Sequence, residues 1–170
     1  MLRHKKESNN MDITHIGDAI LSQKASEVTE PLSASVQTLI DKMFDTMQTE
    51  KGVGLAAPQV NVSKRIAVIN TDDTKLVFIN PQITKKSDDI ILFTEGCLSV
   101  PNKELPILRH QQITVEYIDR DGKNCSLKAR EFLAVVCQHE IDHLDGILMT
   151  DRYKQQTTLR ETLNITQKTI

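Results

Sequence analysis

Apolar residues in the first part of the chain recur every three or four positions. Between residues 32 and 48 this spacing predicts an amphipathic helix. Pro31 stands just before it, where proline is tolerated. The apolar positions are Val36, Leu39, Ile40, Met43, Phe44 and Met47. A stripe of Met and Phe at helical spacing is typical of core packing, so we expect this face to be buried.

The pattern then changes to short apolar runs that are typical of strands. They cover residues 66–69, 76–79 and 90–93. Residues 113–118 alternate between apolar and polar, and a turn at 119–122 separates them from 124–127, which predicts a β-hairpin. Strands and helices with hairpin connections indicate an α+β fold with short antiparallel or mixed sheets, rather than a doubly wound sheet.

A continuous apolar run at residues 132–137 leads into a second helical segment that stops at Gly146, a natural C-terminal cap. We expect this helix to be buried on most sides, with the sheets packed around it. With 170 residues, of which 39% are hydrophobic, the chain can bury a single core. We predict a disordered extension at 1–10, one catalytic domain at 11–151 and a helical C-terminal tail at 152–170.

Charge and cysteine content narrow the classes of partner and compartment. The formal net charge is -2, which argues against DNA binding driven by overall charge. The three cysteines are an odd number, and no apolar run at the N-terminus resembles a signal peptide, so free thiols and a cytoplasmic location are expected. The sequence contains no membrane span.

The candidate chemistry lies in the second helix, where residues 139–143 read His-Glu-Ile-Asp-His. Four residues are about one helical turn, so His139 and His143 project from one face and can bind one cation. Glu140 lies beside that face, too far round the helix to be a comfortable ligand. This position suits a base that acts on a metal-bound water.

Catalytic metal sites usually have three protein ligands and one open position. No histidine follows His143, which argues against a metzincin, while a zincin with a carboxylate ligand stays open. The candidate third ligand is Cys97, in the segment Glu-Gly-Cys-Leu-Ser at 95–99. One Cys and two His form a soft site that accepts iron, zinc, nickel or cobalt.

Residues 52–59 read Gly-Val-Gly-Leu-Ala-Ala-Pro-Gln, a run of small residues that permits close backbone approach. Its spacing fits neither a P-loop nor a dinucleotide-binding loop. A packed turn, to which small residues are equally suited, is the plainer interpretation.

Taken in order, the segments at 54–59, 95–99 and 138–143 resemble the three motifs of the peptide deformylases, and the likeness covers roughly residues 12–150. The short connections are similar to the compact bacterial type. The resemblance implies removal of the formyl group from the N-formylmethionine of newly made polypeptides. It also implies one divalent metal ion, Fe(II) in its native form, and transient contact with the ribosome.

The same resemblance implies a mechanism, in which a metal-bound water attacks the formyl carbon while Glu140 takes its proton and passes it to the leaving amine. The side-chain amide of Gln59 and the backbone N–H of Leu98 would stabilise the charge on the formyl oxygen. The backbone at Val53 and Gly54 would pair with the extended peptide as an added strand.

A pocket for the methionine side chain is expected on the metal face of the second helix. Apolar residues four or seven positions before a metal histidine are Phe132, Val135 and Val136. By position in the family, Val53 and Phe93 join them. Such a wall suits an unbranched thioether, although ordinary core packing accounts for the same side chains equally well.

The remaining polar residues have plainer interpretations. Glu95 is expected to orient the loop of Cys97 by accepting a bond from Arg109, as the resemblance suggests. Cys137 points away from the metal because it lies two residues before His139 on the helix. We expect inert thiols and surface or satisfied histidines at Cys125, Cys137, His4, His15 and His110.

One departure from the family concerns Glu104, which stands where well-studied bacterial members often have an arginine that grips the substrate backbone. This reversal of charge puts peptide affinity or substrate choice in doubt.

Two other functions compete with deformylation. One is a metallopeptidase of the His-Glu-x-x-His type, and the other is a catalytically idle relative that binds protein N-termini.

Overall fold

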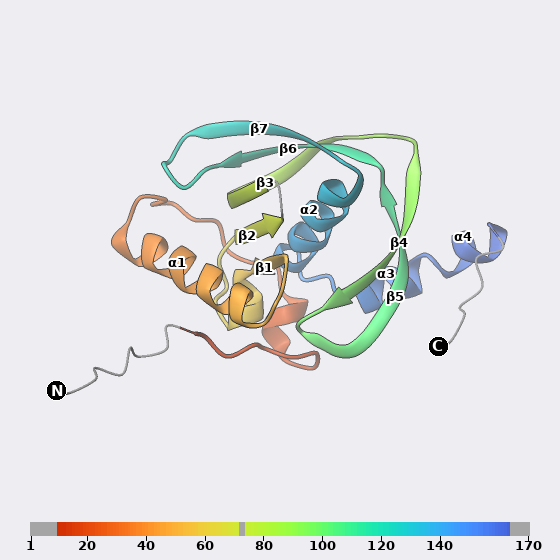
Figure 1. Ribbon diagram of the computed structural model, residues 1–170, viewed down its shortest axis with the longest axis horizontal. Helices are drawn as coiled ribbons and strands as arrows, with labels where there is room; N and C mark the ends of the chain where they lie inside the picture. Colours follow the sequence, from red (N-terminus) through yellow and green to blue (C-terminus); the bar gives the residue numbers. More distant parts are fainter. Residues whose placement is uncertain (1–9, 72–73, 164–170) are drawn as a thin grey trace.

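The computed structural model describes residues 10–71 and 74–163 (Figure 1). The predicted extension at 1–10, apart from Asn10, lies outside the described residues, as does His4. The elements in chain order are η1 Ala19–Ser22, α1 Ala34–Thr49, β1 Gly54–Ala56, η2 Ala57–Val60, β2 Ile66–Thr71, β3 Thr74–Lys86, β4 Ile90–Cys97, β5 Val100–His110, β6 Gln112–Ile118, β7 Asn124–Arg130, α2 Glu131–Leu144, α3 Met149–Gln155 and α4 Thr157–Thr162.

Two antiparallel sheets enclose the second α-helix. The larger sheet has the strand order β1-β2-β3-β6-β7, and the smaller sheet is the β4–β5 hairpin. Figure 1 shows α2 between the two sheets, with α1 beside β1 and β2 and with α3 beside β5. This arrangement confirms the predicted α+β fold around a central helix.

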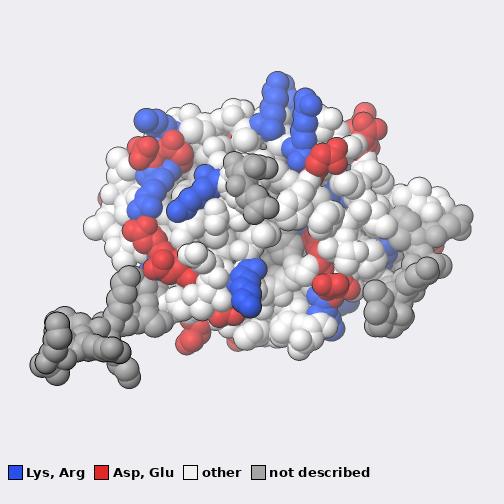
Figure 2. Space-filling model, in the orientation of Figure 1, with Lys and Arg blue, Asp and Glu red and all other residues white. Residues whose placement is uncertain are grey.

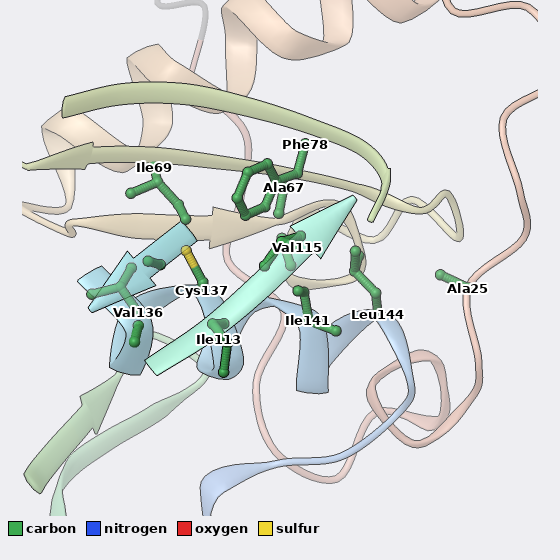
Figure 3. Close-up of a cluster of buried hydrophobic side chains, with 13 residues drawn as sticks. Ala25, Ala67, Ile69, Phe78, Ile113, Val115, Val136, Cys137, Ile141 and Leu144 are labelled. Atoms are coloured by element: carbon green, nitrogen blue, oxygen red, sulfur yellow. The ribbon is translucent and has the colours of Figure 1, made fainter. Parts of the chain in front are cut away.

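The main core lies between α2 and the large sheet (Figure 3). Ala134, Cys137 and Leu144 of α2 are fully buried there against Phe78 and Val115 of the sheet. A second cluster lies under α1 and contains the predicted apolar stripe of that helix, with Leu39 and Phe44 only partly buried. Burial of apolar surface therefore holds both helices to the same sheet.

The predicted helix at 32–48 and the predicted strands are confirmed, with shifted ends. The strand expected at 90–93 runs on to Cys97, and the expected hairpin is formed by β6 and β7. The interpretation of residues 52–59 as a packed turn is wrong for Gly54–Ala56, which form β1 and pair with β2. The rest of that segment is the 3-10 helix η2.

Strand β5 was missed in the sequence because its pattern is unlike that of a strand. It contains Pro101 and Pro106 and the adjacent charges of Lys103 and Glu104. Proline is tolerated on edge strands, where its missing N–H need not bond a neighbour. Here β4 is the only strand that pairs with β5 among the described residues.

Helix α2 ends at Leu144, close to the predicted stop. Gly146 has φ +73°, and a Cβ there would lie 2.8 Å from backbone atoms of Ser22 and Gln23. The chain then turns into α3, which begins at Met149 and crosses the expected boundary between 151 and 152.

Within the described ranges, no helix has the length and apolar character needed to cross a bilayer. On the face in Figure 2, basic and acidic side chains are interspersed.

Candidate metal centre

Three side chains that can bind a soft metal ion meet at one end of α2. Cys97 at the end of β4 and His139 and His143 on α2 offer ligand atoms that all lie within 4.8 Å of one another. His143 Nε2 is 3.3 Å from Cys97 Sγ and 3.2 Å from His139 Nε2. Thiolate and imidazole together suit Fe(II), Co(II), Ni(II) or Zn(II), so this donor set fits a divalent transition metal. No second group of this kind occurs within 10–71 and 74–163.

Local geometry explains why these residues meet. The histidines are one turn apart on a helix that is buried against the sheet, so both side chains project from the same face of the helix. In the β4–β5 hairpin the register shifts between Gly96 and Cys97, where Cys97 pairs with Val100. The thiol of Cys97 therefore comes from the smaller sheet and the imidazoles come from α2.

His139 is oriented by a buried carboxylate that sequence reasoning did not assign to it. Its Nδ1 lies 2.8 Å from Glu95 Oε2, which leaves Nε2 for a metal. Arg109 holds Glu95 through a two-pronged pair, Nε to Oε1 at 2.6 Å and Nη2 to Oε2 at 2.9 Å, which confirms the predicted Glu95–Arg109 bond. The signal for the missed contact was present, because Glu95 and Cys97 are two apart on one strand and share a face.

The protonation of His143 and Glu140 is set mainly by burial. Burial lowers the pKa of His143 well below its usual value, aided by the charges of His139 and Arg109, and so favours the neutral imidazole that binds metals. Burial raises the pKa of the Glu140 carboxyl to about 7. Glu140 Oε2 is buried and has no hydrogen-bond partner among the described residues. A carboxyl of this kind can accept and release a proton near neutral pH.

Gln59 points its side-chain amide toward the same place. Its Oε1 accepts a bond from the backbone N–H of Ala56 at 2.8 Å, which fixes the amide orientation. Its Nε2 lies 3.3 Å from Ser99 Oγ and 3.6 Å from Cys97 Sγ. Leu98, the other predicted oxyanion donor, directly follows Cys97 and lines the same cavity.

The cavity in front of these residues has a volume of about 1650 Å³. All the predicted substrate-binding residues line it, namely Val53, Gly54, Phe93, Phe132, Val135 and Val136. The rings of Phe93 and Phe132 are 5.5 Å apart between centroids. Val135 and Val136 are buried deeper in the wall, and Val136 also belongs to the main core.

Sequence reasoning missed one wall of the cavity, which the segment at residues 10–15 contributes through Asn10, Met11, Asp12, Ile13 and His15. The backbone N–H of Thr14 donates to Gln59 O, and that of Ile16 donates to Ser99 O, both at 2.8 Å. No periodicity marks this segment, because its contacts are to distant loops.

Cys125, Cys137 and His110 have the plain roles expected of them, while His15 is exposed and lines the cavity. Cys137 lies in the main core, and burial raises the pKa of its thiol to about 12, so it stays an unreactive thiol. His110 Nδ1 is 2.7 Å from Ser87 O. Cys125 Sγ lies 3.5 Å from Asp119 Oδ2 in the β6–β7 hairpin.

Known proteins are similar to this chain in sequence and in fold. The sequence profile of the polypeptide deformylase family matches residues 10–158. The peptide deformylase of Dictyoglomus turgidum is 44% identical over 151 residues, which cover 89% of this chain and 97% of that protein. The peptide deformylase of Synechococcus elongatus in complex with actinonin has a TM-score of 0.82 at 38% identity, covering 91% of this chain and 84% of that one. The Met-Ala-Ser-bound class I type b enzyme of Acinetobacter baumannii has a TM-score of 0.81 at 33% identity, covering 85% and 99%.

Proposed function

Because the chain belongs to the peptide deformylase family of formyl-removing metallohydrolases, we propose that it removes the formyl group from the N-formylmethionine of newly made polypeptides. The observation that supports this most is the convergence of Cys97, His139 and His143 at a cavity that Glu140 also lines. We place the reaction in the cytoplasm, on chains emerging from a ribosome that the enzyme contacts transiently.

We assign one divalent cation to Cys97 Sγ and to the Nε2 atoms of His139 and His143. When bound, the cation lowers the pKa of a water molecule and polarises the formyl oxygen. The donor set accepts zinc, nickel and cobalt as well as iron, so Fe(II) as the native ion follows from the family alone. Glu95 keeps His139 in the tautomer that presents Nε2 to the cation.

Glu140 moves the proton in this reaction. Its Oε2 accepts a proton from the attacking water, and the same carboxyl delivers a proton to the nitrogen that leaves with the methionine. A pKa of about 7 supports both steps, since the group is neither fully charged nor fully neutral near pH 7.

Two donors would stabilise the negative charge that develops on the formyl oxygen, the side-chain amide of Gln59 and the backbone N–H of Leu98. The bond from Ala56 N–H to Gln59 Oε1 supports this role, because it directs the Nε2 donor toward Cys97. A donor that is already oriented costs no reorganisation when the charge forms.

The peptide would lie along the cavity with its backbone against Val53 and Gly54. Its methionine side chain would contact the apolar wall of Phe93, Phe132 and Val135, together with Val136. The Acinetobacter baumannii enzyme was solved with bound Met-Ala-Ser, which starts with methionine as a product of deformylation does and supports a peptide ligand of this kind.

Formate release from formyl-Met-Ala-Ser, compared with acetyl-Met-Ala-Ser and Met-Ala-Ser, tests the proposal. We expect formate from the formyl peptide and no reaction with the other two. Cleavage of the Met-Ala bond would identify a metallopeptidase, and binding without turnover would identify a catalytically idle relative. Metal analysis of anaerobically purified protein identifies the native ion.

Replacing Glu140 with Ala tests its role directly. We expect kcat to fall by about 10²–10⁴-fold, the usual contribution of general acid-base catalysis, while the metal content is unchanged. Glu116→Ala on the exposed surface of β6 is the matched control and should keep wild-type turnover. A Glu140→Ala protein with wild-type kcat would show that another group moves the proton.

A further inference from the structure

A line of charged side chains connects α3 to His139. Arg152 on α3 donates from Nη2 to Asp142 Oδ1 at 2.5 Å and from Nε to Asp142 Oδ2 at 2.8 Å. Asp142 Oδ2 also accepts from Arg109 Nη1 at 2.5 Å. Arg109 in turn holds Glu95, the carboxylate that bonds His139 Nδ1. The line therefore joins an element outside the metal centre to a candidate metal ligand.

From this geometry we propose that Arg152 is a positioning residue that raises the affinity of the site for a divalent cation by fixing the orientation of His139. The inference rests on the metal site proposed above. Partners of a ligand imidazole fix its ring orientation and tautomer, and their loss weakens metal binding. Arg152 acts on these partners from one step further out, through Asp142 and Arg109.

The pattern of burial supports the direction of this effect. The side chains of Glu95, Arg109 and Asp142 are 3–9% exposed, whereas that of Arg152 is 33% exposed. Asp142 Oδ1 accepts a hydrogen bond from Arg152 alone among the described residues. Without Arg152, the buried carboxylate of Asp142 has an unpaired oxygen and can rotate toward Arg109. Arg109 then divides its donors differently between Asp142 and Glu95, and Glu95 loses its fixed position beside His139.

The sign of the change in metal affinity distinguishes a positioning role of Arg152 from a purely electrostatic one. The four charged members of the line balance, with two guanidinium groups and two carboxylates. Removing Arg152 leaves a net negative charge, which by itself would attract a dication more strongly. Loosening of His139 has the opposite effect and weakens binding. A lower affinity after the loss of a positive charge is therefore a mark of positioning.

The experiment measures the affinity for Zn²⁺ and Co²⁺ by competition with a chromogenic chelator, with no substrate present. Arg152→Met removes the charge and the donors, and Arg152→Lys keeps the charge but lacks the planar fork. Lys154→Met is the matched control, because Lys154 is exposed on the same helix and has no ion pair among the described residues.

We expect Arg152→Met to weaken metal binding by roughly 3–10-fold, less than the 10–100-fold typical of a partner bonded directly to the ligand. Arg152→Lys should fall between Arg152→Met and wild type, and Lys154→Met should stay within about twofold of wild type or bind slightly more tightly. If Arg152→Met does not fold, a weaker affinity of Arg152→Lys supports the inference and an unchanged one overturns it.

Unchanged or tighter metal binding by Arg152→Met overturns the inference, even if urea unfolding shows that the protein is less stable, because that result describes a structural contact only. A wild-type chain that binds no ion overturns the metal site itself and this inference with it. A wild-type chain that binds one ion, beside Arg152 variants that bind it equally well, overturns the positioning role alone.

Discussion

Glu140 and Gly54 share a space that a side chain at position 54 would fill. A Cβ on Gly54 would overlap Glu140 Oε1 and lie 2.7 Å from its Cδ. Glu140 is buried, so a side chain at position 54 would force its carboxyl out of the position that it holds here. The orientation of the proposed base therefore depends on the absence of a side chain in β1, in addition to any approach of substrate to that strand.

We predict that Gly54→Ala lowers kcat substantially while metal content stays at the wild-type level. The three atoms nearest to the added methyl group all belong to Glu140 and none belongs to a metal ligand, so the carboxyl is the group that is displaced. The loss should be a large part of the roughly 10²–10⁴-fold that general acid-base catalysis contributes. Steady-state deformylation and metal analysis of the same preparation check this.

Gly52→Ala is the matched control for this change, because its Cβ would first meet the flexible side chain of Leu98 at 3.1 Å. It should keep kcat within roughly tenfold of wild type, well short of the loss expected for a displaced base. Wild-type kcat in Gly54→Ala would mean that the carboxyl has another productive position.

Glu104 is exposed in β5, pairs in register with Gly96 and lines the cavity. We predict that Glu104→Arg lowers KM for formyl peptides, because a guanidinium offers donors to a peptide backbone that a carboxylate lacks. Binding gained equally in the ground and transition states leaves kcat within about twofold. Kinetics with formyl-Met-Ala-Lys and formyl-Met-Ala-Glu measure both KM for the peptide and any preference for a charged residue.

Glu116→Arg makes the same change of charge on β6, outside the cavity lining, and controls for long-range electrostatics. A lower KM in Glu104→Arg alone supports contact with substrate. If neither peptide binds better in Glu104→Arg and the preference for Lys or Glu does not reverse, position 104 does not contact the peptide.

Helix α2 carries most of the candidate chemistry, and its end is held by a close backbone contact. Gly146 has φ +73°, and its Cα faces the backbone of Ser22 and Gln23. We predict that Gly146→Ala destabilises the protein by more than the approximately 1–2 kcal/mol that a left-handed conformation costs a residue with a Cβ. Urea unfolding of the metal-loaded protein measures this.

Gly122→Ala separates the two causes of that loss. Gly122 has a similar φ of +79°, but the three atoms nearest to its Cβ would all belong to the flexible side chain of Leu32. The excess loss in Gly146→Ala over Gly122→Ala then reports the backbone contact. Equal losses in the two variants would mean that the segment at Ser22 and Gln23 moves away at little cost.

The metal centre connects two parts of the molecule, because Cys97 belongs to the β4–β5 hairpin and the two histidines belong to α2. An ion that binds only the folded chain stabilises it by about 2.7 kcal/mol at 100 times Kd. For a protein of this size we predict a rise in Tm of roughly 5–10 °C when metal is added back to chelator-treated protein.

Thermal unfolding of the chelated and reconstituted protein tests this prediction. Cys97→Ala is the control, since it lacks the ligand from the hairpin and should show little or no rise in Tm at the same metal concentration. An equal rise in both proteins would mean that the added ion binds elsewhere.

Local sequence pattern is sufficient to predict the parts of the protein whose geometry repeats over a few residues. The spacing of Val36, Ile40, Met43 and Met47 predicts α1 because a helix turns every 3.6 residues. The same period places His139 and His143 on one face, and Glu140 beside that face. The Asp-Arg-Asp-Gly turn predicts the β6–β7 hairpin. These features depend on neighbours in the chain, and so they can be read from local pattern.

Contacts between residues far apart in the chain follow from the packing of the sheets and helices and have no local pattern. The strand character of β5 comes from its pairing with β4, against the tendency of Pro101 and Pro106. The contact of Gly54 with Glu140 and the bond of Glu95 to His139 join residues 86 and 44 positions apart. No local period encodes such contacts, because they arise only when the sheets close around α2 and bury these groups together.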